Sequence, residues 1–284
     1  CPLPILAAPV IQVLVSEPSG IYQNAADSLI RELGRRHDDW KTELSTLNGA
    51  VPQESDLIVA IGTRALEAAL SSSGGKPVLS LLVPRLTYER LAINQRQASA
   101  LYLDQPLSRQ LQLLKLALPG VRQVGVPLGP TSKEMLLTLQ QASDESGVRA
   151  NGAIVGKSQD LLAVLTDLAE DNQTFLLLPD PVVAQRGMLP GFFLHTYRLR
   201  KPVLAYSSPL VDSGALLGIY ITPEQAGREA AGWVAESWGR NGFQLGASRY
   251  PKLFTVRINR TVARSLDITL PSEEKISSQL EALQ

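Results

Sequence analysis

Short polar and basic side chains follow several of the apolar runs in this sequence. The carboxyl ends of parallel strands meet at one edge of a sheet, where the free N–H groups of helix N-termini attract anionic groups. Hydroxyl groups there can donate to a carboxylate, a carboxylate can accept from an ammonium group, and an arginine can pair with a larger anion. The predicted ligand-binding residues are Ser16, Ser19, Thr63, Arg64, Arg85, Thr131, Ser132, Asp180, Tyr206 and Ser207.

Each of these residues also has an ordinary structural interpretation. Ser and Thr commonly cap helices, and solvent exposure alone accounts for Arg64 or Arg85. As a set these residues are stronger evidence for a site, because five of them belong to the first series of strands, before residue 106, and five to the second series. If each series forms one lobe and the lobes are apposed, the two groups would face each other across a cleft.

The common catalytic constellations are absent from the sequence. His37 lies in the charged stretch Arg-Arg-His-Asp-Asp, and His195 lies in an amphipathic helical pattern, where a hydrogen-bonded histidine is commoner than a general base. The sequence contains no Gly-x-Ser-x-Gly turn, no zinc-spaced His/Cys cluster, no phosphate-binding loop and no Gly-x-Gly-x-x-Gly. We therefore predict no catalytic residue, no metal site and no cofactor.

The charge balance argues against a nucleic-acid partner. Lys and Arg number 27, as do Asp and Glu, so the formal net charge is zero and no basic stripe stands out. Aromatic residues make up only 5% of the chain, which weakens the case for stacking on sugars or bases, and Trp233 and Trp238 are interpreted as packing residues. No apolar run reaches the ~18 residues that a membrane span requires.

The single cysteine, Cys1, predicts a lipid anchor rather than a disulfide. A chain that starts at a cysteine followed by the stretch PLPILAAP resembles a processed bacterial lipoprotein, in which that cysteine carries lipid. The alternative is that Cys1 marks an arbitrary boundary. Lipidation would tether a soluble body to a bacterial membrane, so that the membrane is a partner only through the anchor.

The order of the elements predicts an α/β protein with parallel sheets. Short apolar runs alternate with longer helical patterns, which is typical of βαβ units. A first series has strands predicted at 11–16, 41–46, 56–62 and 77–82. After a helix at 108–118, a second series has strands at 123–129, 148–156, 174–179 and 201–206, with a helix from the end of the third strand to about residue 200.

The remaining segments extend this pattern. An apolar strand is predicted at 213–222, a helix at 223–239, and one more strand and a short helix at 250–271. The polar tail 272–284 is predicted to be a surface helix without a role in the core.

Several stretches resemble a known family: DLIVAIGTRALEAAL, KPVLSLL, LDQPLSRQLQLLKLALPGVRQVGVPLGPTS, LLLPDPVV, TYRLRKPVLAYSSPLVDSGALLGIYITPEQAGREAA and VRINRTVARSLDITLP. They are similar in order and spacing to ABC-transporter substrate-binding proteins related to the tryptophan/tyrosine-binding lipoproteins. The resemblance implies a type I periplasmic-binding-protein fold, in which two Rossmann-like lobes joined by a hinge hold a small ligand. It also implies that the strand 213–222 returns to the first lobe. The expected lobes are 1–105 with 213–250, and 106–212 with 251–284.

One segment departs from the family pattern. Members of the family carry an Asp-Pro and then a Pro-Gly-Gly-Asn-x-Thr-Gly stretch before the hinge, whereas residues 83–105 here read VPRLTYERLAINQRQASALYLDQ, without glycine. The resemblance favours a periplasmic, lipid-anchored solute receptor for an ABC permease, with a small polar, amino-acid-like ligand. The departure supports the alternative of a non-transport accessory lipoprotein that uses the same fold to bind an envelope complex. An enzyme on this scaffold would rest on analogy alone.

Overall fold

The computed structural model describes residues 8–47 and 54–283, so Cys1 lies outside the described residues. The chain divides into two compact lobes. The first consists of the residues up to Asp104 together with Ile221–Phe254, and the second of Gln105–Tyr220 together with Thr255 onward. The chain therefore passes from one lobe to the other three times.

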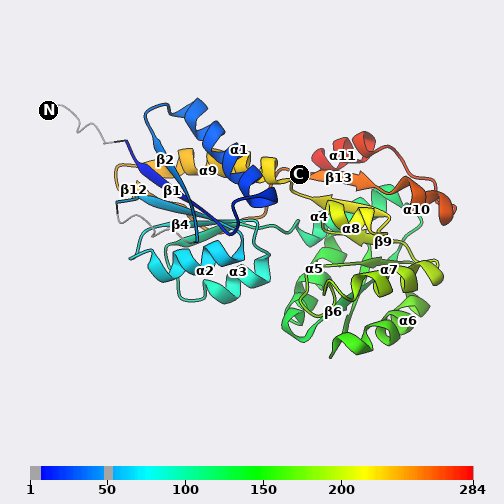
Figure 1. The fold of residues 1–284 in the computed structure, drawn as a ribbon. Helices are drawn as coiled ribbons and strands as arrows, with labels where there is room; N and C mark the ends of the chain where they lie inside the picture. The colour runs from blue at the N-terminus through cyan, green and yellow to red at the C-terminus, as the bar shows by residue number, and fades with distance from the viewer. Residues whose placement is uncertain (1–7, 48–53, 284) are drawn as a thin grey trace. The chain divides into compact units, whose positions relative to one another are not determined.

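The first lobe contains a five-stranded parallel sheet (Figure 1). Its central strands are almost entirely apolar and buried, as expected for strands covered on both faces. Edge strand β2 is mostly polar, and none of its residues is fully buried. In spatial order the strands are β2 (Lys41–Thr46), β1 (Val10–Val15), β3 (Leu57–Ile61), β4 (Val78–Leu81) and β5 (Ala98–Leu101).

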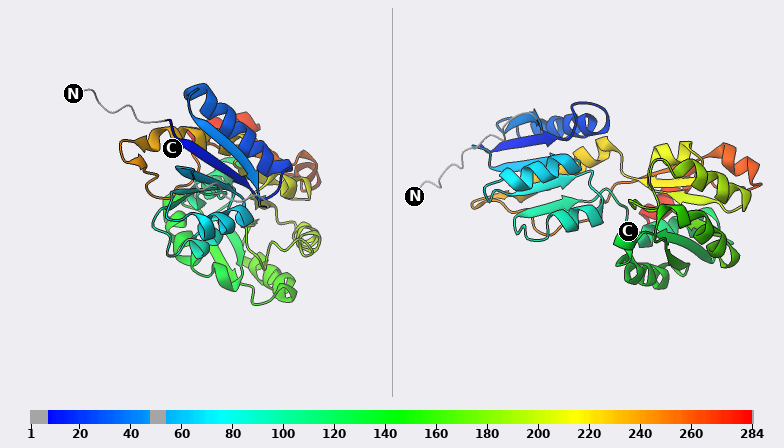
Figure 2. Two further views of the ribbon diagram at one scale, coloured as in Figure 1. Left: turned by 60° about the vertical axis from the view of Figure 1, so that its left-hand side comes forward. Right: turned by 60° about the horizontal axis from the view of Figure 1, so that its bottom comes forward.

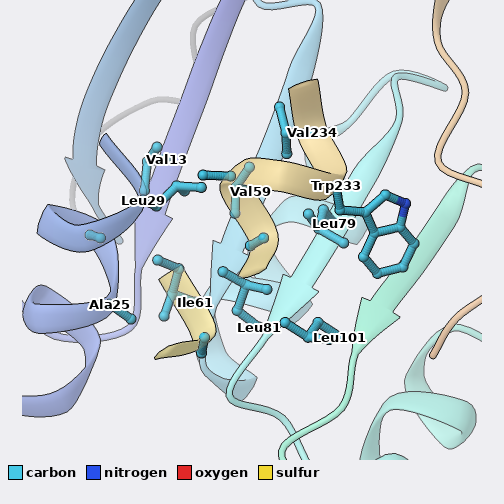
Figure 3. Packing of buried hydrophobic residues seen from close by; sticks show 14 of the residues in the cluster. Val13, Ala25, Leu29, Val59, Ile61, Leu79, Leu81, Leu101, Trp233 and Val234 are labelled. Atoms are coloured by element: carbon cyan, nitrogen blue, oxygen red, sulfur yellow. The ribbon is translucent and has the colours of Figure 1, made fainter. Parts of the chain in front are cut away.

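Helices cover both faces of this sheet (Figure 2). One face packs against α1 (Gly20–Arg36) and α9 (Pro223–Ser237), and the other against α2 (Thr63–Ser72) and α3 (Arg85–Leu91). Figure 3 shows side chains of α1, α9 and the strands gathered in the first of these two layers. The short hairpin β11 (Trp238–Gly239) and β12 (Gly242–Phe243) follows α9.

Helices α1 and α9 pack closely through Gly227. A Cβ atom at Gly227 would lie 2.3 Å from the carbonyl oxygen of Ala25 and 2.8 Å from the backbone nitrogen of Leu29. The Ser28 hydroxyl donates to the Glu224 carbonyl oxygen at 2.8 Å, which fixes the same crossing. A segment more than 190 residues away in sequence thus completes the first lobe.

The second lobe contains a six-stranded sheet, parallel except for β13, which pairs antiparallel with β10. No residue of its edge strand β7 is fully buried, whereas the central strands are buried. In spatial order the strands are β13 (Thr255–Ile258), β10 (Leu217–Tyr220), β9 (Val203–Ala205), β8 (Thr174–Leu176), β6 (Gln123–Leu128) and β7 (Arg149–Ile154).

Two groups of helices enclose this sheet. Residues of three helices pack with β8 and β9 in one hydrophobic cluster: α6 (Leu161–Asp171), α7 (Leu189–Arg198) and α8 (Ser208–Asp212). Contacts between helices join α4 (Leu107–Ala117) to both α5 (Met135–Ser146) and α11 (Glu273–Glu281). The short helix α10 (Arg260–Ser265) follows β13.

The prediction that the strand at 213–222 returns to the first lobe is wrong. Strand β10 lies in the second-lobe sheet, between β9 and β13, and the chain enters the first lobe only at Ile221. The predicted boundaries at 212 and 250 accordingly move to 220 and 254. An apolar strand fits either sheet equally well. Its place is shown only by its pairing with β9 (Leu217↔Leu204) and with β13 (Leu217↔Ile258).

Three further expectations need correction. Strand β5 and helix α3 lie in a segment for which the sequence suggested no element. The helix expected directly after the strand at 174–179 begins only at Leu189. The tail helix α11 does join the core, because Ile276 and Leu280 are fully buried. Those two residues are four positions apart and form a narrow apolar stripe on an otherwise polar helix.

The packing interpretation of the tryptophans is confirmed. Trp233 is buried and its indole nitrogen donates to the Leu245 carbonyl oxygen at 2.8 Å. Trp238 packs on Phe243 with ring centroids 4.7 Å apart. Within the described part of the chain, no helix is both long enough and apolar enough to cross a membrane.

The α1–α9 crossing yields a stability prediction. Gly227→Ala should lower the free energy of unfolding by about 1–3 kcal/mol, because the new methyl group meets helix backbone that must move apart. Gly232→Ala on the same helix is the matched control, since its nearest neighbour is an Arg36 nitrogen at 4.0 Å. That change should raise stability by up to about 1 kcal/mol through helix propensity. Urea denaturation measures both, and equal stability of the two variants would contradict the crossing.

Candidate functional site

The five predicted ligand-binding residues of the first lobe all lie at the carboxyl edge of its sheet. Ser16 follows β1, and Ser19 is the N-cap residue of α1. Thr63 and Arg64 open α2 directly after β3, and Arg85 opens α3 after β4. Because β1, β3 and β4 are neighbours, the fold brings these turns together at one edge.

Ser16 caps the N-terminus of helix α2. Its side chain is buried, and its hydroxyl oxygen accepts a hydrogen bond from the backbone N–H of Ala65 at 3.0 Å, in the first turn of α2. The N-cap residue Gly62 has a φ of +90°, and a Cβ atom there would lie 2.5 Å from the Ser16 hydroxyl oxygen and 2.6 Å from the Tyr22 ring. Ser16 thus caps α2 from a neighbouring strand, and only glycine leaves room for it.

Exposure separates the other first-lobe candidates. Ser19 and Arg64 are exposed, and Thr63 is half-buried. The Ser19 side chain makes no capping hydrogen bond, although it occupies the N-cap position of α1. Ser19 and Thr63 can therefore offer hydroxyl groups at this edge.

Arg85 is held by several contacts at the end of β4. Its backbone N–H donates to the Asp104 carboxylate at 2.5 Å, and its Nη1 donates to the Tyr250 hydroxyl at 3.0 Å. Its Nε lies 3.5 Å from the Glu89 carboxylate. The pKa of the guanidinium is lowered by burial, but Tyr250 and Glu89 outweigh this effect and leave it above its ordinary value. Arg85 is thus a fixed cation.

Three tyrosines pack together beside this arginine, and one of them, Tyr250, contacts it. Tyr102 packs edge-on against Tyr88, with ring centroids 5.9 Å apart, and against Tyr250 at 5.2 Å. Burial raises the pKa of all three hydroxyl groups, so they remain protonated at neutral pH. Burial also raises the pKa of the Asp104 carboxyl, which the Arg85 backbone N–H partly offsets.

In the second lobe, Asp180 organises two loops. It is buried, and four donors converge on its carboxylate: the Ser132 hydroxyl and the backbone N–H groups of Gly129 (2.8 Å), Val182 (2.7 Å) and Val183 (2.9 Å). A carboxylate offers about four acceptor positions. Asp180 and Ser132 therefore satisfy each other and the adjoining backbone, which leaves little capacity for a ligand ammonium group.

The remaining second-lobe candidates also lie at the carboxyl edge. Thr131 is exposed in the short 3-10 turn after β6, and Ser207 is the half-buried N-cap residue of α8. Tyr206 is half-buried and packs on the hydrophobic cluster around β9. Nearby, Arg257 of β13 donates to the Ser208 hydroxyl and, at 2.5 Å, to Asp212.

Sequence reasoning missed Tyr250, Asp104 and Arg257. Tyr250 is 165 positions from Arg85, and Arg257 is 49 positions from Ser208. The candidate residues were chosen because they follow a predicted strand. None of these three does so in the predicted pattern, and they were therefore not chosen. Tyr250 follows Arg249, whose backbone N–H donates to the Ala100 carbonyl oxygen at 2.8 Å beside β5, and only this pairing brings it to Arg85.

The histidines have structural surroundings. His195 Nε2 lies 2.9 Å from the Thr166 hydroxyl, which agrees with the hydrogen-bonded helix-face interpretation, and the His37 ring stacks on Trp40 at 4.0 Å. Among residues 8–47 and 54–283, no group of three His, Cys, Asp or Glu side chains is arranged to hold a metal ion.

The Asp180 network gives a second stability prediction. Asp180→Ala should lower the free energy of unfolding by about 3 kcal/mol. The change leaves several buried backbone N–H groups without an acceptor, and each unsatisfied donor costs about 1–3 kcal/mol. Asp167→Ala is the matched control, since this carboxylate is exposed on α6. Urea denaturation of both variants measures the difference, and an Asp180 variant as stable as the control would refute the structural role.

Solved structures of similar fold cover nearly the whole chain. The ABC domain from Streptococcus pneumonia, in complex with L-Trp, is 16% identical with a TM-score of 0.63, covering 95% of this chain and 98% of its own. A ligand-free, open substrate-binding protein with adhesive properties from Clostridium difficile is 17% identical with a TM-score of 0.73, covering 94% and 97%. A periplasmic ribose ABC transporter structure from Conexibacter woesei is 12% identical with a TM-score of 0.57, covering 95% and 98%.

At these identities the likeness establishes the fold, which is that of type I periplasmic binding proteins. A comparison with curated proteins gives no significant match. The family and these neighbours are binding proteins rather than enzymes. The model of the family described as "ABC transporter substrate binding protein" matches residues 33–280, and the chain therefore belongs to the ABC transporter substrate-binding protein family.

Proposed function

We propose that this protein is the solute receptor of an ABC-type transport system and holds a small polar, amino-acid-like ligand between its lobes. The observation that carries the proposal is the position of the candidate side chains: in each lobe they emerge at the carboxyl edge of a parallel sheet, where α/β proteins bind ligands. Family membership supports it, and one neighbour in fold binds L-Trp.

The proposed partners follow from the family. A receptor of this kind works outside the cytoplasm and delivers its ligand to an ABC permease, and three crossings of the chain supply a hinge for closure. Thr63, Arg64, Arg85, Thr131 and Ser207, with Ser19 and Tyr206, are the proposed ligand contacts. Ser16, Ser132 and Asp180 are proposed to hold the backbone of the same turns. The proposal includes no cofactor, metal or nucleic acid.

A second candidate is an accessory lipoprotein that binds an envelope complex instead of transporting a solute. It is favoured by the glycine-free segment 83–105, which departs from the family pattern, and by the adhesive properties of the neighbour from Clostridium difficile. Failure to bind any small molecule would favour this candidate over the first.

Ligand screening tests the solute-receptor proposal. A panel of amino acids, including L-tryptophan, with ribose and other sugars, nucleosides and small organic acids should contain a compound that raises the melting temperature by several degrees at about 100 times its Kd. Small-angle scattering should then show a smaller radius of gyration. Thr63→Ala should weaken binding, whereas Ser71→Ala at the other end of α2 should not. A panel without any stabilising compound would refute transport.

The lipid anchor is tested separately. We expect the N-terminal peptide of the protein isolated from its own membrane to carry acyl chains on Cys1, and mass spectrometry measures the added mass. Cys1→Ser should release the protein from the membrane fraction, because one or more acyl chains supply the attachment. Membrane retention of the Cys1→Ser protein would overturn the proposed anchor.

A further inference from the structure

Arg85 and Tyr250 form a donor pair at the carboxyl edge of the first lobe. Only 22% of the Arg85 side chain is exposed, and its Nη1 donates to the Tyr250 hydroxyl oxygen at 3.0 Å. Because that oxygen accepts from the arginine, the hydroxyl proton is directed elsewhere. Within the described residues, neither the Tyr250 hydroxyl proton nor Arg85 Nη2 has a hydrogen-bond partner. The buried Nε faces the Glu89 carboxylate at 3.5 Å.

The surroundings keep this pair in place. The Asp104 carboxylate accepts from the Arg85 backbone N–H, and the Leu103 N–H donates to the Val83 carbonyl oxygen at 3.1 Å. Leu82, the first residue after β4, has a φ of +55°, a left-handed conformation that costs about 1–2 kcal/mol for a non-glycine residue. A strained, multiply bonded turn of this kind directs one side chain to a fixed place.

The charge of Arg85 is only partly compensated. Glu89 is the one acidic side chain with which it forms an ion pair among the described residues, at 3.5 Å, and 46% of the Glu89 side chain is exposed. Such an exposed pair contributes little, because water screens it. A partly buried guanidinium with unused donors is suited to an oxyanion, which forms charge-assisted hydrogen bonds with it.

We infer that Arg85 and Tyr250 bind an oxyanion of the ligand, a carboxylate or a phosphate, and so determine its class. This inference rests on the proposed solute-binding function. It selects Arg85 over Arg64, because Arg64 is exposed and, within the part of the chain that the structure describes, no hydrogen bond or ion pair fixes its guanidinium. It also assigns a role to the segment in which this chain departs from its family.

Isothermal titration of the full chain tests the inference. The probes are the twenty L-amino acids, their carboxamides and inorganic phosphate. At least one amino acid should bind, and its carboxamide should bind at least about tenfold more weakly. The Arg85→Gln variant should bind the same amino acid about tenfold more weakly than the unchanged protein, as expected for the loss of a charged hydrogen bond. Binding of phosphate that is sensitive to Arg85→Gln would identify the oxyanion as phosphate.

Two variants serve as controls. Arg90→Gln removes an exposed arginine from the same helix and should leave affinity unchanged. Glu89→Gln removes the competing carboxylate and should raise affinity by a few-fold. Tyr250→Phe should weaken binding less than Arg85→Gln, since it removes one neutral donor. Circular dichroism spectra and melting temperatures verify that every variant is folded.

The possible results separate the inference from the proposed function. Equal affinity for an amino acid and its carboxamide, or an unaffected Arg85→Gln variant, would overturn the oxyanion site. A neutral sugar or nucleoside that binds while every oxyanion fails would also overturn it, and would leave the solute-receptor function standing. Failure of every probe and of the wider metabolite panel would refute both.

Discussion

The first lobe depends on one contact between distant parts of the chain, the close packing of α9 on α1 through Gly227. Strands β1, β3 and β4 are almost entirely apolar, and α1 shares the covering of one of their faces with α9. Residues Ile221–Phe254, which return to the first lobe, add apolar side chains to this face, including Ile221 and Trp233. Burying side chains of this size is worth about 1.5–3 kcal/mol each. The first lobe is therefore completed only after the chain has built most of the second, and the crossing segments join the two.

The parallel sheets position the candidate site, but the residues at their edges divide into two kinds. Ser16 caps a helix from a neighbouring strand, and Asp180 collects four donors from two loops. Both are buried and accept hydrogen bonds from backbone N–H groups, so their polarity serves the backbone. Ser19, Thr63, Thr131 and Ser207 are less constrained. A ligand-binding edge needs both kinds, because exposed donors recognise a ligand well only when the turns that carry them are rigid.

The sequence predicted the α/β class, both series of strands and the carboxyl-edge turns, because hydrophobic period and turn residues are local signals. It failed where the deciding contact is not local. Strand β10 is apolar enough for either sheet, and its place is set by pairing with β9 and β13. Strand β5 has only four residues, and the core role of α11 rests on Ile276 and Leu280 alone. Tyr250 reaches Arg85 only through its neighbour's pairing with β5.

The glycine-free segment 83–105 is best understood through what it adds. Glycines let a loop adopt many conformations and bring backbone close to a ligand. Here the segment forms α3 and β5 instead, and its Tyr88 and Tyr102 pack with Tyr250, which holds Arg85. In the oxyanion site that we propose, a charged side chain recognises the ligand. A guanidinium held in place favours an oxyanion, because a neutral group at the same position would leave the guanidinium donors unsatisfied. The range of ligands is narrower as a result.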